Sequence, residues 1–107
     1  MKLIGCEELK RKIDLGEEFV LVNALDEDKF RAMHIPGSVN ICREEDIKKC
    51  LSLEAVIVVY CADESCDRSI VLYRQLEGYG YRNVYRFAGG LRAWTAAGYE
   101  LVGEMVA

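Results

Sequence analysis

Residues 56–78 read VIVVYCADESCDRSIVLYRQLEG. The unbroken apolar run, rich in β-branched residues, predicts a buried strand over 55–60. Apolar residues at helical spacing predict a helix over 68–78. The residues between them are mostly small or polar and predict a loop. The stretch is therefore a strand–loop–helix unit with Cys61 at the carboxyl end of the strand.

Cys61 is the first residue of this loop. The backbone N–H groups of such a loop and the N-terminus of the following helix carry partial positive charge and attract anions. A thiol held there should ionise more readily than free cysteine, whose pKa is about 8.5. Because the thiolate is the nucleophilic form, we interpret Cys61 as a reactive cysteine in an anion-binding loop. The alternative is a buried cysteine that only packs.

The rest of the chain alternates between strand and helix patterns. Further helices are predicted over 7–15, 27–33, 44–51 and 91–97, and further strands over 19–22, 39–41 and 84–87. Asp26 is placed to cap the helix that follows it, and His34 begins a turn in which we expect it to tie the backbone together rather than act as a base. Alternating strands and helices predict a parallel sheet covered on both faces, with Cys61 at the edge where such sheets hold their sites.

Length and charge narrow the class of protein. The chain has 107 residues, 51% apolar and 30% charged, which suits one domain over residues 1–107. A formal net charge of −4 argues against a nucleic-acid partner, and the lack of a dense basic run argues against an anionic membrane surface. No apolar stretch is long enough to cross a bilayer, and Glu7 and Glu8 come too early for a signal peptide. We therefore expect a cytoplasmic protein.

Five cysteines are present: Cys6, Cys42, Cys50, Cys61 and Cys66. An odd number without a secretion signal suits reduced thiols rather than a disulfide framework. Their spacing is not that of a zinc site, and the single histidine, His34, is distant in sequence from Cys61 and Cys66. The sequence therefore predicts no metal site.

Several motifs in this order and spacing make the chain resemble the rhodanese-like sulfurtransferases. They are HIPGSVNI (34–41), VVYC (58–61), RS (68–69), GYGYRNV (78–84), GGLRAW (89–94) and AGY (97–99). The resemblance implies an α/β, three-layer fold with a central five-stranded parallel sheet flanked by helices. It also implies transfer of sulfane sulfur from thiosulfate or a persulfide donor to a thiol acceptor through a persulfide on Cys61. No cofactor is implied.

The loop departs from the commonest family pattern. Six residues rather than four separate Cys61 from Arg68, and Cys66 is among them. This resembles a subgroup with a C-x4-C-x-x-S loop, matched by Cys61, Cys66 and Ser69. A longer loop can admit a larger anion. A phosphatase or arsenate reductase that uses the same type of loop, or a regulatory module without catalysis, therefore remains an alternative.

Each loop position has a predicted role and an alternative. We expect Cys66 to resolve the Cys61 persulfide, or otherwise to pack inside the loop. Arg68 would bind the donor's oxyanion, or face solvent in an ordinary ion pair. Ser69 would cap the helix or hydrogen-bond the thiolate, with capping favoured. The remaining predicted substrate-binding residues would contribute backbone N–H groups: Ala62, Asp63, Glu64, Ser65 and Asp67. The three acids among them would form a solvated rim that disfavours doubly charged donors.

Overall fold

Strand β3 (Ile57–Tyr60) runs through the centre of the structure, a computed structural model that describes residues 1–106. All four of its residues are buried, as the apolar run predicts. Parallel neighbours flank it on both sides, β1 (Val20–Asn23) on one and β4 (Val84–Phe87) on the other. The short β2 (Val39–Asn40) adds to β1, which gives the strand order β2-β1-β3-β4.

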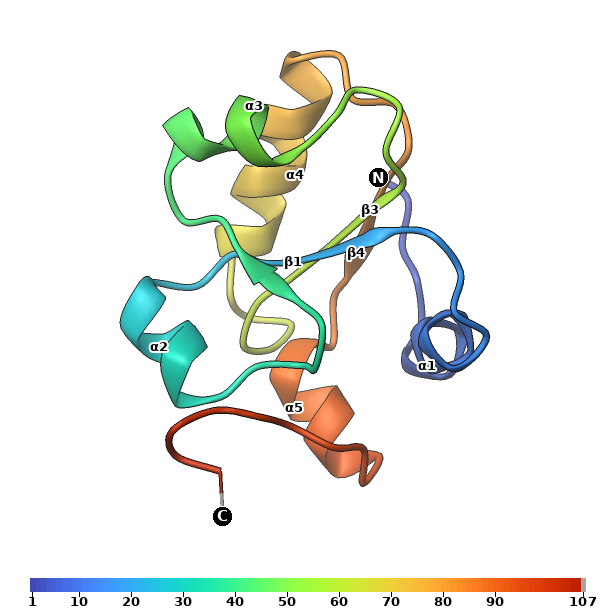
Figure 1. Cartoon of the computed structure of the whole chain (residues 1–107), viewed down its shortest axis with the longest axis vertical. Coiled ribbons are helices and arrows are strands. Elements are labelled where there is room, and N and C mark those ends of the chain that lie inside the picture. Colours follow the sequence, from blue (N-terminus) through green and yellow to red (C-terminus); the bar gives the residue numbers. More distant parts are fainter. Residues whose placement is uncertain (107) are drawn as a thin grey trace.

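Helices cover both faces of this sheet (Figure 1). Helices α3 (Ile47–Cys50) and α4 (Arg68–Gly78) lie on one side, and α1 (Cys6–Asp14) and α5 (Gly90–Ala96) on the other, with α2 (Glu27–Ala32) near the end of β2. The predicted α/β fold, a parallel sheet between two layers of helices, is therefore confirmed. The bounds of α4 and β4 are those the sequence predicts.

The sheet has four strands in the described residues 1–106, rather than the five that the family resemblance implies. Where a fifth strand would lie, Leu3 makes a single parallel bridge to Arg86 of β4. Two backbone hydrogen bonds hold it there: Ile4 donates to the Arg86 carbonyl at 3.0 Å, and Arg86 donates to the Lys2 carbonyl at 2.8 Å. The N-terminal segment thus occupies the fifth position without forming a strand, because α1 begins at Cys6.

Two local predictions about helices are wrong. The helix predicted over 44–51 is a 3-10 turn, η1 (Glu44–Asp46), followed by the four residues of α3. Asp26 stands at the start of α2 but makes no capping hydrogen bond with its side chain. Its carboxylate instead forms an ion pair with Arg68, a residue that is distant in the sequence.

The turn that contains His34 is anchored to the core. Its backbone N–H at Ile35 donates to the Tyr60 hydroxyl at 3.0 Å, and the Ser38 hydroxyl lies 2.9 Å from the same oxygen. His34 bonds through Nδ1 to the Phe30 carbonyl at 2.7 Å and stacks on the Phe30 ring. The prediction that His34 ties the backbone together is confirmed.

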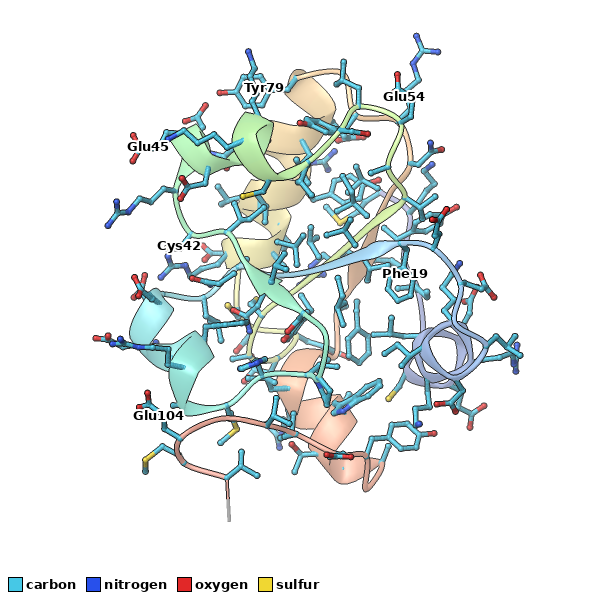
Figure 2. The ribbon with its side chains drawn as sticks, viewed as in Figure 1. Phe19, Cys42, Glu45, Glu54, Tyr79 and Glu104 are labelled. Atoms are coloured by element: carbon cyan, nitrogen blue, oxygen red, sulfur yellow. The ribbon has the colours of Figure 1, made fainter. Side chains whose placement is uncertain are left out.

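Charged side chains such as Glu45 and Glu104 project from the body of the molecule (Figure 2).

Candidate active site

The Cys61 thiol lies at the carboxyl end of β3, at the bottom of the loop before α4. The residue is only 1% exposed. Its Sγ is 3.3 Å from the Ser69 hydroxyl and 3.5 Å from the Cys66 carbonyl oxygen. Ser69 is itself 1% exposed and belongs to the first turn of α4. The predicted alternation of strand, loop and helix thus places the thiol at the N-terminus of the helix, as expected.

The N-terminus of α5 fixes the first two residues of the loop. The backbone N–H of Leu91 donates to the Cys61 carbonyl at 3.0 Å, and that of Arg92 donates to the Ala62 carbonyl at 2.9 Å. Gly90 has φ +59°, and a Cβ there would overlap the Cys61 carbonyl and come within 2.9 Å of the Ala62 carbonyl. Gly90 is therefore required for this contact. The sequence pattern reveals only that the glycine pair ends a strand.

Not every loop N–H group faces the thiols. The N–H groups of Ser65 and Cys66 donate within the loop, to the side-chain and backbone oxygens of Asp63 at 3.0 and 3.2 Å. The prediction that all the loop N–H groups converge on one anion is therefore wrong for these two. The backbone of Ala62 and Arg68 instead acts on Cys66, whose pKa it helps to lower. Two of the predicted loop donors are thus used to shape the loop itself.

The two thiols of the loop share a hydrogen bond, and their acidities differ. Burial raises the pKa of Cys61, and its hydrogen bond with Cys66 raises that pKa further, although Ser69 opposes both. Burial also acts to raise the pKa of Cys66, but hydrogen bonds from Cys61, Ala62 and Arg68 outweigh it and lower that pKa. The expectation that Cys61 ionises more readily than free cysteine is therefore wrong, because burial and the contact with Cys66 raise its pKa more than Ser69 lowers it. The more acidic thiol is that of Cys66.

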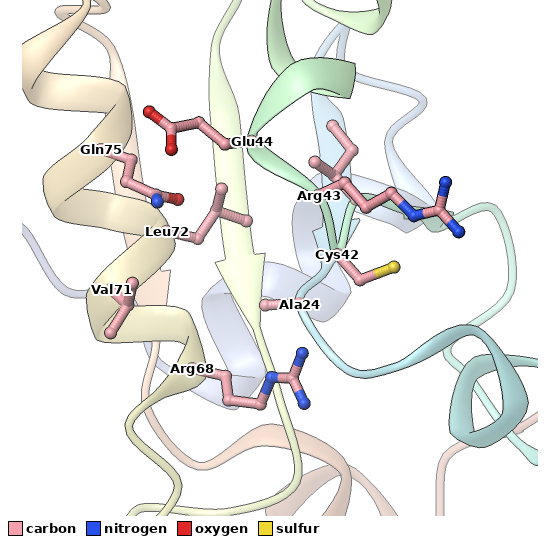
Figure 3. A pocket seen from close by; sticks show the side chains of 9 residues that line it. Ala24, Cys42, Arg43, Glu44, Arg68, Val71, Leu72 and Gln75 are labelled. Atoms are coloured by element: carbon pink, nitrogen blue, oxygen red, sulfur yellow. The ribbon is translucent and has the colours of Figure 1, made fainter.

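Arg68 points away from the Cys61 thiol. Its guanidinium pairs with the Asp26 carboxylate at 2.8 Å, which lowers the pKa of Asp26 and raises that of Arg68. The side chain extends from α4 into an open pocket of about 230 Å³, toward the side on which Ala24 and Cys42 lie (Figure 3). Cys61 does not line this pocket. In the structure Arg68 is thus a partly exposed, ion-paired residue beside the loop.

The three acids of the loop lie at its outer rim. Glu64 and Asp67 are exposed. The Asp63 carboxylate accepts hydrogen bonds from the hydroxyl and N–H of Ser65 at 2.6 and 3.0 Å, and the hydroxyl contact is the main cause that lowers the pKa of Asp63. A second open pocket, of about 420 Å³, separates this rim from Arg92 of α5. The predicted acidic rim is present.

Ser69 and a residue that sequence reasoning missed, Arg86, complete the surroundings of Cys61. The Ser69 hydroxyl accepts a hydrogen bond from Nε of Arg86 at 2.8 Å, so the prediction that it caps the helix is wrong. Arg86 is 7% exposed, and its Nη2 is 3.5 Å from the Cys66 carbonyl. An arginine inside the short apolar run VYRF is an exception to the usual surface position of this residue. This unusual position is the feature of the sequence from which Arg86 could have been predicted as a site residue.

The other cysteines lie outside this cluster. All five are free thiols; Cys42 and Cys50 are exposed and Cys6 is half-buried. Cys42 lines the pocket into which Arg68 extends, but its side chain is not among the contacts of Cys61. Among residues 1–106, no three His, Cys, Asp or Glu side chains are gathered as a metal site requires. No helix in the same residues has the length and apolar character needed to cross a membrane.

Comparison with known proteins gives the same family for most of the chain. The model of the rhodanese-like domain matches residues 6–97. A protein named thiosulfate sulfurtransferase GlpE, from Pseudomonas savastanoi, is 33% identical over 79 residues, which cover 72% of this chain and 73% of that protein. YrkF of Bacillus subtilis, named as a sulfur carrier protein, is 28% identical over 92 residues, which cover 86% of this chain but only 50% of YrkF, so this chain spans half of that relative.

Solved structures agree with the fold. The crystal structure of the BH2092 protein from Bacillus halodurans superposes with a TM-score of 0.89 at 27% identity, and the match covers 97% of this chain and 78% of that one. The family model, the relatives and this structure all include the segment from β3 to α4 that carries Cys61. The chain belongs to the family of rhodanese-like domains.

Proposed function

We propose that the protein is a sulfurtransferase that carries sulfane sulfur as a persulfide on Cys61. The observation that supports this most strongly is the buried Cys61 thiol at the N-terminus of α4, within 3.3 Å of the Ser69 hydroxyl, in a rhodanese-like domain. The names of the relatives, thiosulfate sulfurtransferase and sulfur carrier protein, support sulfur as the transferred group. The partners would be a small anionic sulfur donor and a thiol acceptor.

The first step takes sulfur from the donor. The Cys61 sulfur attacks the outer sulfur of thiosulfate, the S–S bond of the donor breaks, and sulfite leaves with the bonding electron pair. Cys61 becomes a persulfide anion, and its proton passes to the Cys66 thiolate. Cys66 is placed to take this proton because the two thiols share a hydrogen bond, and its lowered pKa makes its thiolate form more readily than that of Cys61.

The second step passes the sulfur on. An external thiol attacks the outer sulfur of the persulfide and leaves as a new persulfide, which restores Cys61. If no acceptor arrives, Cys66 attacks the inner sulfur, so that a Cys61–Cys66 disulfide forms and hydrosulfide leaves. A lowered pKa makes Cys66 suited to this resolving attack, since the thiolate is the attacking form.

The reaction is tested by turnover with thiosulfate and a thiol acceptor. We expect sulfite to form in proportion to the thiosulfate consumed, with a persulfide on the acceptor. A phosphatase or arsenate reductase would release phosphate from an aryl phosphate or reduce arsenate instead. If the folded protein released no sulfite from thiosulfate and passed no sulfur from a persulfide donor to the thiol acceptor, the proposed activity would be excluded.

The number of cysteines supports a reducing compartment. The sequence has five, an odd number that suits reduced thiols better than a disulfide framework. Free thiols persist in the cytoplasm, where cellular reductants keep disulfides rare. We therefore place the proposed activity in the cytoplasm.

Arg68→Ala should lower the rate with anionic donors such as thiosulfate more than the rate with a neutral dialkyl trisulfide. The guanidinium is partly exposed beside the loop, and its ion pair with Asp26 is open to solvent and thus readily exchanged for a donor anion. The matched control is Asp26→Asn, which frees Arg68 and should raise the rate with thiosulfate. Equal losses with both donor types would make Arg68 a structural residue only.

Cys66→Ala should load sulfur to the same extent as the wild type but hold it longer. The variant loses the thiol that resolves the persulfide, while Cys61 loses a neighbour that raises its pKa. Oxidation of the wild type should join Cys61 and Cys66, which cleavage after glutamate residues would reveal, because peptides 55–64 and 65–77 would then stay linked. Cys42→Ala serves as the control. Identical persulfide decay in all three proteins, without that linked pair, would leave Cys66 as a packing residue.

A further inference from the structure

Arg86 is a buried cation without a carboxylate partner. Its side chain lies inside the sheet layer at 7% exposure, on the strand β4 that neighbours β3. No carboxylate of the described residues 1–106 forms an ion pair with it, although seven ion pairs occur elsewhere in that part of the chain. A buried charge is costly unless an opposite charge or a full set of hydrogen bonds compensates it. Hydrogen bonds must therefore compensate the charge of Arg86.

Both acceptors of Arg86 touch the Cys61 thiol. Nε donates to the Ser69 hydroxyl at 2.8 Å, and Nη2 approaches the Cys66 carbonyl oxygen at 3.5 Å. The Cys61 Sγ lies 3.3 Å from that hydroxyl and 3.5 Å from that carbonyl. The guanidinium thus contacts Cys61 indirectly, through the Ser69 hydroxyl and the Cys66 carbonyl. One hydrogen-bonded group therefore separates the guanidinium from the ionisable sulfur of Cys61.

The direction of these hydrogen bonds determines what Ser69 can do. A guanidinium only donates, so Nε of Arg86 occupies a lone pair of the Ser69 oxygen. The single hydroxyl proton of Ser69 is then free to point at the Cys61 sulfur. A hydroxyl that accepts from a cation is also a stronger donor, because the two hydrogen bonds polarise each other. Ser69 is thus prepared to stabilise negative charge on Cys61.

We propose that Arg86 is a positioning residue that acts through Ser69 to stabilise the anionic forms of Cys61, the thiolate and the persulfide. The inference rests on the proposed role of Cys61 and adds the counter-charge which that role requires. Its location explains why an arginine is tolerated in the sheet layer. It also explains how a thiol as buried as Cys61 can become an anion without a lysine or histidine beside it.

The test measures the ionisation of Cys61 and not sulfur transfer. Labelling by iodoacetamide is followed against pH in the Cys66→Ala background, which removes the coupled thiol, and the 55–64 peptide reports Cys61 alone. Arg86→Gln should raise the midpoint of Cys61 labelling by about one pH unit, since one charge-assisted network is lost. Exposed Cys50, followed in the same samples, and the exposed-arginine variant Arg82→Gln should show no change.

Ser69→Ala separates the proposed mechanism from a purely structural role. It should raise the same midpoint by a similar amount, and the Arg86→Gln/Ser69→Ala double variant should raise it no further, because both residues act on one hydrogen bond. Should Arg86→Gln not fold, Arg86→Lys and Ser69→Ala still decide the question. An unchanged midpoint in Ser69→Ala, or shifts that add in the double variant, would overturn the proposal. Neither result depends on whether thiosulfate loads the protein, so failure of the proposed function is recognised separately.

Discussion

Cys61→Ser should reduce sulfur loading from thiosulfate to the level measured without protein. The hydroxyl is nearly the same size as the thiol but cannot form a persulfide, so the chemical step is lost while the packing is kept. The site accommodates a hydroxyl, since the Ser69 hydroxyl and the Cys66 carbonyl already lie within 3.5 Å of this position. We therefore expect a folded variant whose free energy of unfolding changes by about 1 kcal/mol or less.

The control for this variant is Cys50→Ser, which changes an exposed thiol in the same way. It should load sulfur like the wild type. Loading is measured as the gain of one sulfur atom per chain after brief exposure to thiosulfate, and folding by thermal denaturation. Substantial loading of folded Cys61→Ser would show that another cysteine carries the sulfur.

Gly90→Ala should have the second-largest effect, on both stability and loading. The left-handed backbone of Gly90 costs a residue with a Cβ about 1–2 kcal/mol. A Cβ would also overlap the Cys61 carbonyl, which belongs to the backbone and cannot move unless the loop moves with it. The contacts from Leu91 and Arg92 to the start of the loop would lengthen. We expect the loading rate to fall by at least about tenfold, and the free energy of unfolding by more than the backbone term alone.

Gly98→Ala is the matched control for the backbone term. Gly98 also has a positive φ, +80°, but a Cβ there would meet no atom within 4 Å. This variant should lose a similar amount of stability from strain alone and should load sulfur at the wild-type rate. If both glycine variants lost loading equally, the contact of α5 with the loop would not be what positions Cys61.

Elements that a local pattern specifies were predicted well. The buried strand before Cys61 and the helix from Arg68 to Gly78 follow from an unbroken apolar run and a helical period, and both formed as expected. The weaker cases are short elements at the edge of the fold. The predicted helix over 44–51 became a 3-10 turn and one turn of α-helix, because few of its residues are buried and little packing selects its length.

The orientation of side chains in the site could not be predicted, because it depends on residues distant in the sequence. Arg68 turns toward Asp26, more than 40 positions earlier, and away from the thiol. Ser69 of α4 turns inward because Arg86 of β4 donates a buried hydrogen bond to its hydroxyl. The acidity of Cys61 follows from its burial, which only the packed loop determines. The residues of the loop could thus be predicted from the sequence, but the orientation of their side chains and the acidities of their thiols could not.

The position of the added sulfur atom after exposure to thiosulfate shows whether Cys61 is the residue that carries it. The persulfide is trapped by alkylation, and the chain is cleaved after its glutamate residues. This places Cys61 in peptide 55–64, Cys66 in peptide 65–77 and Cys50 in a separate peptide. We expect one extra sulfur in peptide 55–64 and none elsewhere at early times. Extra sulfur confined to the peptide of Cys66, or found in none of the peptides of the folded protein, would contradict it.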